Sequence, residues 1–220
     1  MAKYRLGVMG TFTNKVGIVV GRKWRNQDVM SAYQPKVANP RSKKQVESRG
    51  RFSEASKLAR AFRFVLPVGM GGITAGTKVP PRCAFISDAY KAVEFTYPDT
   101  IDVDYTMLNI AKGNHLSGSF GSPASTEALQ IDVAFSYDLS RLGVDGHDEV
   151  VVVAYNPADN TIAYTRARVN VGTVSFMVPS DWNGETVYLY GFVVASWAVD
   201  KVNSPDDVSD SKYIGSVSIS

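Results

Sequence analysis

The amino-acid sequence predicts an α+β protein: an N-terminal β-hairpin, a long basic amphipathic helix and a second short helix, then an antiparallel β-sandwich. Two observations carry this prediction. Apolar residues recur every three or four positions between residues 39 and 65, whereas they alternate with polar residues in most segments after residue 100. We therefore divide the chain into residues 1–98, a basic hairpin and helical segment, and residues 99–220, a sandwich of the immunoglobulin or fibronectin III type.

The first segment, residues 4–37, is rich in glycine and β-branched residues and is expected to form a hairpin. A turn is predicted at the sequence RNQD, which places Arg22, Lys23, Trp24 and Arg25 at the hairpin tip. Cations next to an aromatic ring are suited to binding phosphates and stacking on bases. The other interpretation is that Trp24 covers the long helix.

A long helix is expected from Asn39 to Val65. Its apolar positions fall within an arc of roughly 140° on a helical wheel, which indicates one buried face. These positions are Phe52, Ala55, Leu58, Ala59, Phe62, Val65 and Leu66. Either Asn39 or Ser42 can cap the start, and Pro67 with the glycines after it is expected to end the helix. Gly50 suggests a kink or the close approach of another segment.

Residues 67–98 are expected to form a connector. Its glycine-rich part, GMGGITAGTKVPP at residues 69–81, is predicted to be a flexible link, because it lacks the Gly-Lys-Ser/Thr ending of a phosphate-binding loop. The segment RCAFISDAYKAVEF, which begins at Arg82, is predicted to be a second helix packed antiparallel to the first. Its Cys83 is the single cysteine, which excludes an internal disulfide. We expect Cys83 to be a small buried residue.

Seven segments after residue 100 have strand character and are separated by polar turns. They are residues 101–110, 128–139, 149–157, 161–171, 174–179, 185–197 and 211–219. Tyr188, Tyr190 and Phe192 share one face of the sixth segment. Its opposite face is also apolar, so this strand is expected to be central and covered on both sides.

Charge is distributed unevenly along the chain. Residues 1–65 contain 15 Lys and Arg against 3 Asp and Glu, giving +12, and the rest of the chain contains 9 against 18, giving −9. Such asymmetry suggests an anionic partner for the basic segment. That partner is either nucleic acid (DNA or RNA) or an acidic protein surface, including a neighbouring copy in a homo-oligomer; a merely solvated basic surface is the third interpretation.

The residues expected to contact this partner lie at the hairpin tip and on the cationic side of the helix. They are Arg22, Lys23, Trp24, Arg25, Lys43, Lys44, Arg49, Arg51, Lys57, Arg60 and Arg63. Lys43 and Lys44 belong to the first turns, where the helix dipole disfavours positive charge. Their position therefore suggests a role in binding.

Recognised catalytic motifs are missing from the sequence. The only histidines, His115 and His147, lie in predicted loops with no second histidine or cysteine at metal-ligand spacing. Neither a G-x-S-x-G nor an H-E-x-x-H motif occurs. We therefore expect no enzymatic activity, no cofactor and no metal site.

The sequence contains no apolar run of about 18 residues and no apolar core of a secretory signal near its N-terminus. We expect no membrane association. The expected location is the cytoplasm, or the virion if a phage encodes the protein.

Several motifs resemble those of an uncharacterised protein family of Bacteroidota bacteria, a domain of unknown function. They are G-x-F-T-N-K-V-G-x-V-V-G-R-K-W from Gly10, N-P-R-S-x-x-Q-V-x-S-R-G-R-F from Asn39, and the later V-P-S-D-W-N-G-E-T-V-Y-L-Y and S-K-Y-I-G. The resemblance covers nearly the whole chain. It implies neither catalytic residues nor a cofactor.

These features favour a non-enzymatic structural or assembly protein, associated with a particle or a phage, whose basic hairpin and helix bind nucleic acid or a neighbouring subunit. The alternative is a protein- or carbohydrate-binding sandwich module. Its contacts would be aromatic side chains in the loops, such as Trp182 and Trp197.

Overall fold

The computed structural model describes residues 2–3, 12–24, 27–36, 39–125, 127–140, 145–199 and 201–219. The chain divides into two compact units, Met1–Ser42 and Lys43–Ser220, and each is considered by itself. This division differs from the boundary predicted between residues 98 and 99.

The N-terminal unit is a small antiparallel sheet in the order β1-β4-β3-β2. Its strands are β1 (Ala2–Lys3), β2 (Asn14–Val16), β3 (Val19–Trp24) and β4 (Gln27–Ala32). The predicted hairpin is confirmed as β3 and β4, in which Trp24 pairs with Gln27, while Arg25 lies outside the described residues. Gly17, with φ of 60°, makes the tight turn between β2 and β3.

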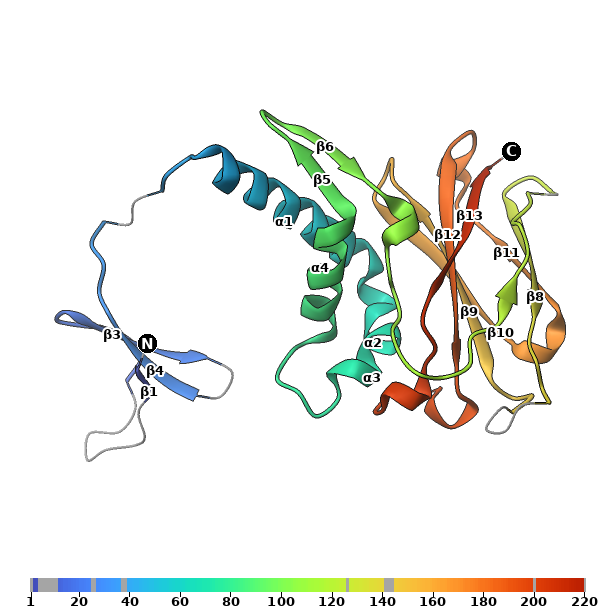
Figure 1. Cartoon of the computed structure of the whole chain (residues 1–220), viewed down its shortest axis with the longest axis horizontal. Coiled ribbons are helices and arrows are strands. Elements are labelled where there is room, and N and C mark those ends of the chain that lie inside the picture. Colours follow the sequence, from blue (N-terminus) through green and yellow to red (C-terminus); the bar gives the residue numbers. More distant parts are fainter. Residues whose placement is uncertain are drawn as a thin grey trace. The chain divides into compact units, whose positions relative to one another are not determined.

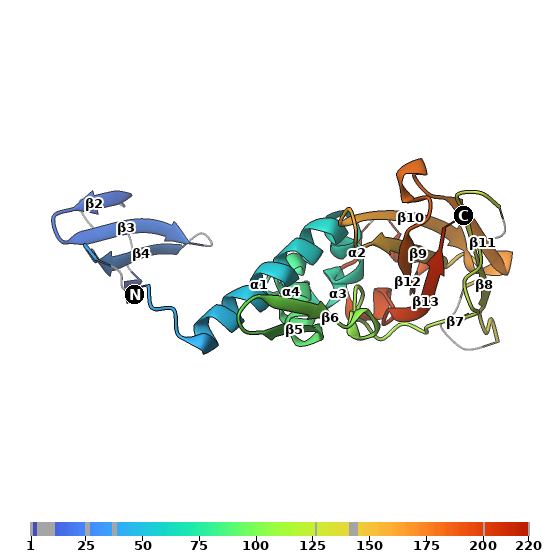
Figure 2. The ribbon, with the colours of Figure 1, turned by 90° about the horizontal axis from the view of Figure 1, so that it is seen from above.

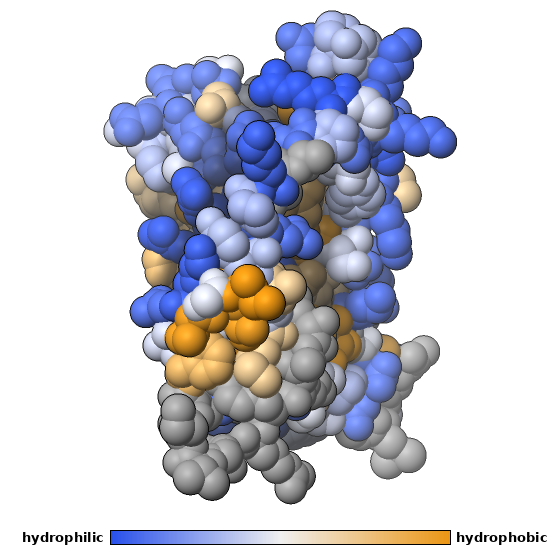
Figure 3. Space-filling model, turned by 90° about the vertical axis from the view of Figure 1, so that its left-hand side faces the viewer, coloured by the Kyte–Doolittle hydropathy of each residue, from blue (hydrophilic) through white to orange (hydrophobic). Residues whose placement is uncertain are grey.

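Apolar side chains at the β2–β3 turn are exposed. Val29 on β4 is buried, whereas Val16 and Ile18 face solvent, Ile18 with 82% of its surface accessible. Figure 3 shows strongly hydrophobic residues gathered in a patch. The described part of this small sheet therefore buries little apolar surface, and such sheets are marginally stable alone.

The second unit begins with a helical layer. Its elements are α1 (Lys43–Ala61), the 3-10 turn η1 (Phe62–Phe64), α2 (Leu66–Gly69), α3 (Gly71–Thr74) and α4 (Pro81–Ala92). α1 begins directly after Ser42, the later of the two predicted starts. Figures 1 and 2 show α4 beside α1, as expected for the second helix.

The prediction of a flexible link at residues 69–81 is wrong in its first half. Gly69, Gly71 and Gly72 are buried within α2 and α3. A side chain at Gly72 would overlap the backbone carbonyl of Ser204, and a Cβ there would lie 3.0 Å from the Cα of Pro205. These glycines permit close packing of two backbones, which sequence patterns alone do not distinguish from flexibility.

Strands make up the remainder of the second unit. They are β5 (Val93–Thr96), β6 (Thr100–Val103), β7 (Ser119–Phe120), β8 (Gln130–Ser136), β9 (Glu149–Asn156), β10 (Thr161–Arg168), β11 (Thr173–Met177), β12 (Thr186–Val194) and β13 (Lys212–Ser218). Short 3-10 turns occur at Tyr105–Met107, Val169–Val171, Ser180–Trp182, Ser196–Ala198 and Pro205–Asp207.

Two antiparallel sheets, β10-β9-β12-β13 and β11-β8-β7, pack face to face. The predicted α+β class with a sandwich-like C-terminal part is therefore confirmed. Six of the seven predicted strand segments form these sheets. The first, 101–110, does not: its residues 101–103 pair with β5 in a separate hairpin.

β9 and β12 are buried on both faces, as predicted for the segment that holds β12. Leu189 and Val193 point into the core between the two sheets, whereas Tyr190 and Phe192 point into the core beneath the helices. The molecule from residue 43 onward thus has three layers: helices, the four-stranded sheet and the three-stranded sheet (Figure 1). Because the helices share a core with the strands, the helical segment belongs to the unit of the sandwich.

Two side chains expected in the core are exposed. The α1 face that packs on the sheet uses Ala55, Leu58 and Phe62, but Phe52, at the margin of the predicted stripe, is 57% exposed. Cys83 is exposed on α4, whose buried residues Phe85, Ala89 and Ala92 lie on another side of the helix. Both predictions were wrong because each residue lies off the buried face of its helix.

We predict that Gly72→Ala lowers the free energy of unfolding by about 1–3 kcal/mol, the usual cost of overpacking, although alanine has the higher helix propensity. Gly146→Ala is the matched control, since a Cβ at Gly146 meets nothing within 4 Å. Urea denaturation followed by circular dichroism measures both. Equal stability of the two variants would contradict the close backbone contact at Gly72.

Candidate nucleic-acid interface

A groove of about 720 Å³ lies along α1 on the side of α4, and we call it the α1–α4 groove. It is lined by Ser48, Arg49, Phe52, Ser53, Ser56, Lys57 and Arg60 from α1, and by Arg82 and Tyr90 from α4. The α1 positions recur at helical spacing and therefore form one continuous strip. Hydroxyl groups, cations and the Phe52 ring lie along it.

Positive charge dominates the α1–α4 groove. Arg49, Arg60 and Arg82 have no ion-pair or hydrogen-bond partner among the described residues, and Lys57 pairs with Glu54 of its own helix at 2.8 Å. None of the described residues that line the groove is acidic. Guanidinium groups that line one groove without acidic partners attract phosphates and carboxylates.

A second groove of about 530 Å³ continues past the end of α1 and reaches β10; we call it the α1–β10 groove. It is lined by Arg60, Ala61, Arg63, Phe64, Asn160, Thr161, Ile162 and Tyr164. Arg60 lines both grooves. The Arg63 guanidinium lies 4.4 Å from the centre of the Phe64 ring, so a cation and an aromatic ring are stacked at its edge.

The floor of the α1–β10 groove is fixed by Asn160, in the turn between β9 and β10. Its side-chain amide donates to the backbone carbonyl of Lys57 at 3.4 Å, and its side-chain oxygen accepts from the Tyr155 hydroxyl at 3.1 Å. These bonds join the turn to α1, so the groove is formed before any ligand binds.

The cations predicted on the long helix are distributed over several environments. Arg49, Lys57, Arg60 and Arg63 line the two grooves. Arg51 is half-buried: it pairs with Glu47 at 2.9 Å, and its guanidinium lies 6.0 Å from the Tyr90 ring centre. It is thus engaged within the helical layer.

Lys43 and Lys44 lie at the start of α1 and are exposed. The ammonium group of Lys43 is 5.5 Å from the centre of the Tyr97 ring, in the turn between β5 and β6. Neither lysine lines the α1–α4 or the α1–β10 groove.

The predicted hairpin residues belong to the N-terminal unit. Arg22 lines a groove of about 790 Å³ together with Ile18, Val19, Met30, Ser31, Ala32 and Gln34. Lys23 and Trp24 are exposed at the end of β3, and Arg25 is outside the described residues. The unit therefore carries its own cations beside exposed apolar side chains.

Sequence reasoning missed Arg82, Phe64 and Tyr164 as members of these grooves. Arg82 and Tyr164 are distant in the chain from the basic residues of α1. Phe64 and Tyr164 were counted as ordinary members of a predicted helix and a predicted strand. Only the packing of α1 against α4 and β10 brings these residues together. Trp182, proposed as a loop contact of a binding module, is 1% exposed in the sandwich core, so that expectation was wrong.

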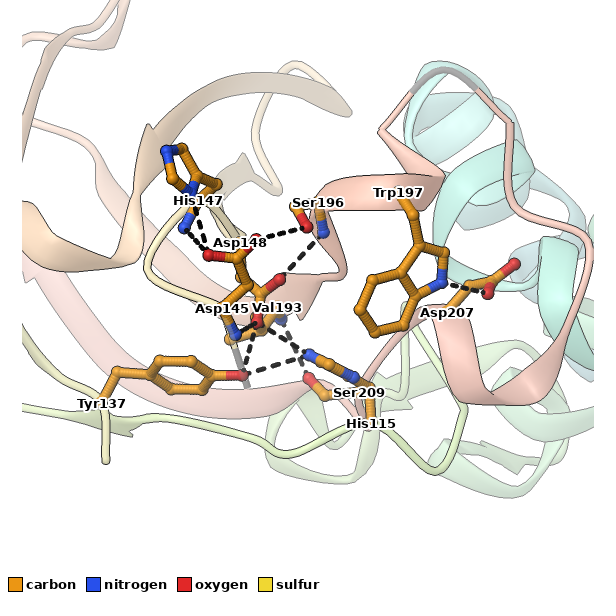
Figure 4. A network of polar contacts seen from close by, with 10 residues as sticks. All are labelled: His115, Tyr137, Asp145, His147, Asp148, Val193, Ser196, Trp197, Asp207 and Ser209. Atoms are coloured by element: carbon orange, nitrogen blue, oxygen red, sulfur yellow. Dashed lines mark hydrogen bonds and ion pairs between the residues drawn. The ribbon is translucent and has the colours of Figure 1, made fainter. Parts of the chain in front are cut away.

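A buried polar network ties the loops together at one end of the sandwich (Figure 4). The fully buried carboxylate of Asp148 accepts from the Tyr137 hydroxyl at 3.1 Å and from the backbone amide of Ser196 at 2.9 Å. The Nε2 atom of His115 lies 3.2 Å from this carboxylate and 3.1 Å from the Tyr137 hydroxyl. Burial and the charge of Asp148 raise the pKa of Tyr137 well above its usual range, so its hydroxyl remains a donor.

A second carboxylate in Figure 4, Asp207, holds the neighbouring turn. Burial alone would raise its pKa, but the backbone amides of Asn203 and Ser204 and the indole N–H of Trp197, all within 3.0 Å, hold the pKa of Asp207 below its usual value. Like Asp148, this carboxylate is occupied by donors of the fold. The arrangement supports a structural role for the network.

Within the described ranges, no three His, Cys, Asp or Glu side chains are grouped so that they could hold a metal ion. No helix in the part of the chain that the structure describes combines the length and hydrophobicity needed to cross a bilayer.

The fold and the two grooves define an α+β protein with a sandwich-like C-terminal part and a cationic helix surface. The chain belongs to the Family of unknown function (DUF6266), whose family model matches residues 10–215. No curated protein matches it significantly.

We predict that Tyr137→Phe lowers the free energy of unfolding by about 1–3 kcal/mol, because the buried Asp148 carboxylate loses a donor. Tyr164→Phe, which removes an exposed hydroxyl, serves as the control and is expected to change stability little. Urea denaturation of both variants is the measurement. Similar stabilities would show that the Tyr137 hydroxyl contributes nothing to the network.

The lowered pKa of Asp207 makes the stability of the fold depend on pH. Its folded-state pKa is below the unfolded value of about 4, so its contribution to stability is present above that pH and is lost as pH falls through the folded pKa. Asp207→Asn should therefore be less stable than wild type at neutral pH, with the difference shrinking in acid. Thermal melting over a pH series measures this; a difference independent of pH would refute it.

Proposed function

We propose that this protein is a non-enzymatic structural protein whose basic α1 surface binds nucleic acid, as part of a particle or another nucleoprotein assembly. The observation that carries the proposal is the gathering of Arg49, Arg60 and Arg82 at one groove without acidic partners among the described residues. Phosphate groups repeat along the backbone of nucleic acid, so a row of cations along a helix can contact several phosphates of one strand.

The position of the acidic side chains supports this proposal. If acidic side chains of the C-terminal part neutralised the cations of α1, these cations would not be available to bind an external anion. Instead, the ion pairs of Arg51 and Lys57 are made with Glu47 and Glu54 of α1 itself. The remaining arginines of the grooves face solvent.

The cationic N-terminal sheet is a second candidate contact in the same function. Arg22, Lys23 and Trp24 combine positive charge with an exposed aromatic ring on a strand next to a turn. Such a sheet can contact a backbone independently of the grooves, and two modules on one chain bind a polymer more tightly than either alone.

We predict that the double variant Arg49→Gln/Arg60→Gln weakens binding of nucleic acid and reduces the slope of log affinity against log salt by about 1.4 to 1.8, the loss expected for two phosphate contacts. Electrophoretic mobility shift and fluorescence anisotropy over a salt series measure both quantities. Lys112→Gln/Lys201→Gln removes the same charge outside both grooves and is the control. Binding that does not depend on salt would contradict the proposal.

The competing function, contact with a neighbouring subunit, is tested on the same material. Size-exclusion chromatography with light scattering gives the mass of the wild type and of the double variant, and the ratio of absorbance at 260 and 280 nm reports copurified nucleic acid. We expect nucleic acid in the wild-type peak and less of it in the variant. A change of oligomer mass with no change in nucleic-acid content would instead assign the groove to subunit contact.

A further inference from the structure

The α1–β10 groove combines groups that a double helix would not use. Phe64 is 61% exposed and Tyr164 is 46% exposed, and both line this groove beside Arg60 and Arg63. Phe52, also exposed, stands in the adjoining α1–α4 groove. Exposed rings cost solvation free energy unless a ligand covers them, and they lie among the cations that would hold its phosphates.

A duplex offers phosphates and sugars to a convex cationic surface, while its bases stay stacked inside. A single strand offers phosphates and the free faces of its bases at the same time. Proteins that bind single strands accordingly combine a positive groove with aromatic side chains on which bases stack. Resting on the proposed function, we infer that the ligand of the two grooves is single-stranded nucleic acid, with bases stacked on Phe64 and Tyr164 and phosphates held by Arg60 and Arg63.

The geometry of the strip fits an extended polymer. From Ser48 to Phe64 the groove-lining residues follow α1 and η1 over roughly 25 Å, at a rise of about 1.5 Å per helical residue. Arg60 stands where the two grooves meet, so one strand can lie in both. Beyond Tyr164, Arg166 and Arg168 occupy alternate exposed positions on β10. Arg166 lies 3.9 Å from the carboxylate of Glu149, so Arg168 is the residue that extends the cationic surface.

The support beneath the rings is rigid. Tyr164 stands on β10, which pairs with β9 along its whole length, and the turn before it is held to α1 through the amide of Asn160. Phe64 ends η1, two residues after the buried Phe62. The two rings are therefore presented by elements that are fixed by the core, which reduces the entropy lost on binding.

Fluorescence anisotropy tests the inference with the full chain, a fluorescein-labelled oligothymidylate, and a duplex of the same length at the same salt. We expect the single strand to bind at least tenfold more tightly than the duplex. Phe64→Ala and Tyr164→Ala should each weaken single-strand binding by about tenfold, the loss for removing one base–aromatic stack, and leave the salt slope unchanged. Tyr164→Phe keeps the ring and should retain wild-type affinity.

Val171→Ala and Met177→Ala are the controls, because these side chains are as exposed as Phe64 but line neither groove. Duplex affinity equal to or above that of the single strand, or Phe64→Ala and Tyr164→Ala variants that match the controls, would overturn the inference while salt-dependent binding still upholds the proposed function. No salt-dependent binding of either nucleic acid would overturn both. Polyglutamate that displaces the oligonucleotide at equal charge concentration would overturn the inference in favour of an acidic peptide.

Discussion

The two-sided burial of β9 and β12 is the constraint on which the second unit depends. One face of this strand pair closes the core of the sandwich, and the other face closes the core beneath α1 and α4. Neither layer can be removed without exposing a face of largely Val, Tyr and Phe side chains, at about 25 cal/mol for each Å² of apolar surface. Sandwich and helices therefore stabilise each other, and α1 is held in a fixed position against the β9–β10 turn.

This fixed position is what produces the grooves. The face of α1 that meets the sheet is apolar, so its cations lie beside that face, at the boundaries with α4 and β10. The arginines are therefore supported by a buried helix, and their positive charge is concentrated where neighbouring elements supply aromatic rings. A mobile basic tail would carry the same charge but would not form a groove in which cations and aromatic rings lie side by side.

The sequence was sufficient to predict elements whose periodic signal is long and unbroken. The apolar stripe from Ala55 to Leu66, the strands from β8 to β13 and the double burial of β12 all follow from spacing alone. Where prediction failed, a contact distant in sequence decided the outcome. The glycines near Gly72 meet the backbone of Ser204, and residues 101–103 pair with the strand that continues α4 instead of joining the sandwich.

The same limit applied to the candidate site. The arginines of α1 were predicted because a charge excess is visible in the sequence, but Arg82 and Tyr164 join them only through packing. Phe52 was predicted to be buried from its angular position on a helical wheel. The wheel does not show how wide a strip of the helix the neighbouring elements cover, and Phe52 lies outside that strip. His115, whose neighbours suggested a loop, contacts a carboxylate 33 residues away.

The order of the layers along the chain also governs how the molecule is made. During synthesis α1 and α4 emerge before β9, β12 and β13. The apolar sides of these helices therefore stay uncovered until the strands are translated, about a hundred residues later. The bond between Asn160 and Lys57 joins residues separated by 103 positions, and loops of that length close slowly. Nascent chains of this protein therefore pass through a stage in which the helical layer has no sheet to cover.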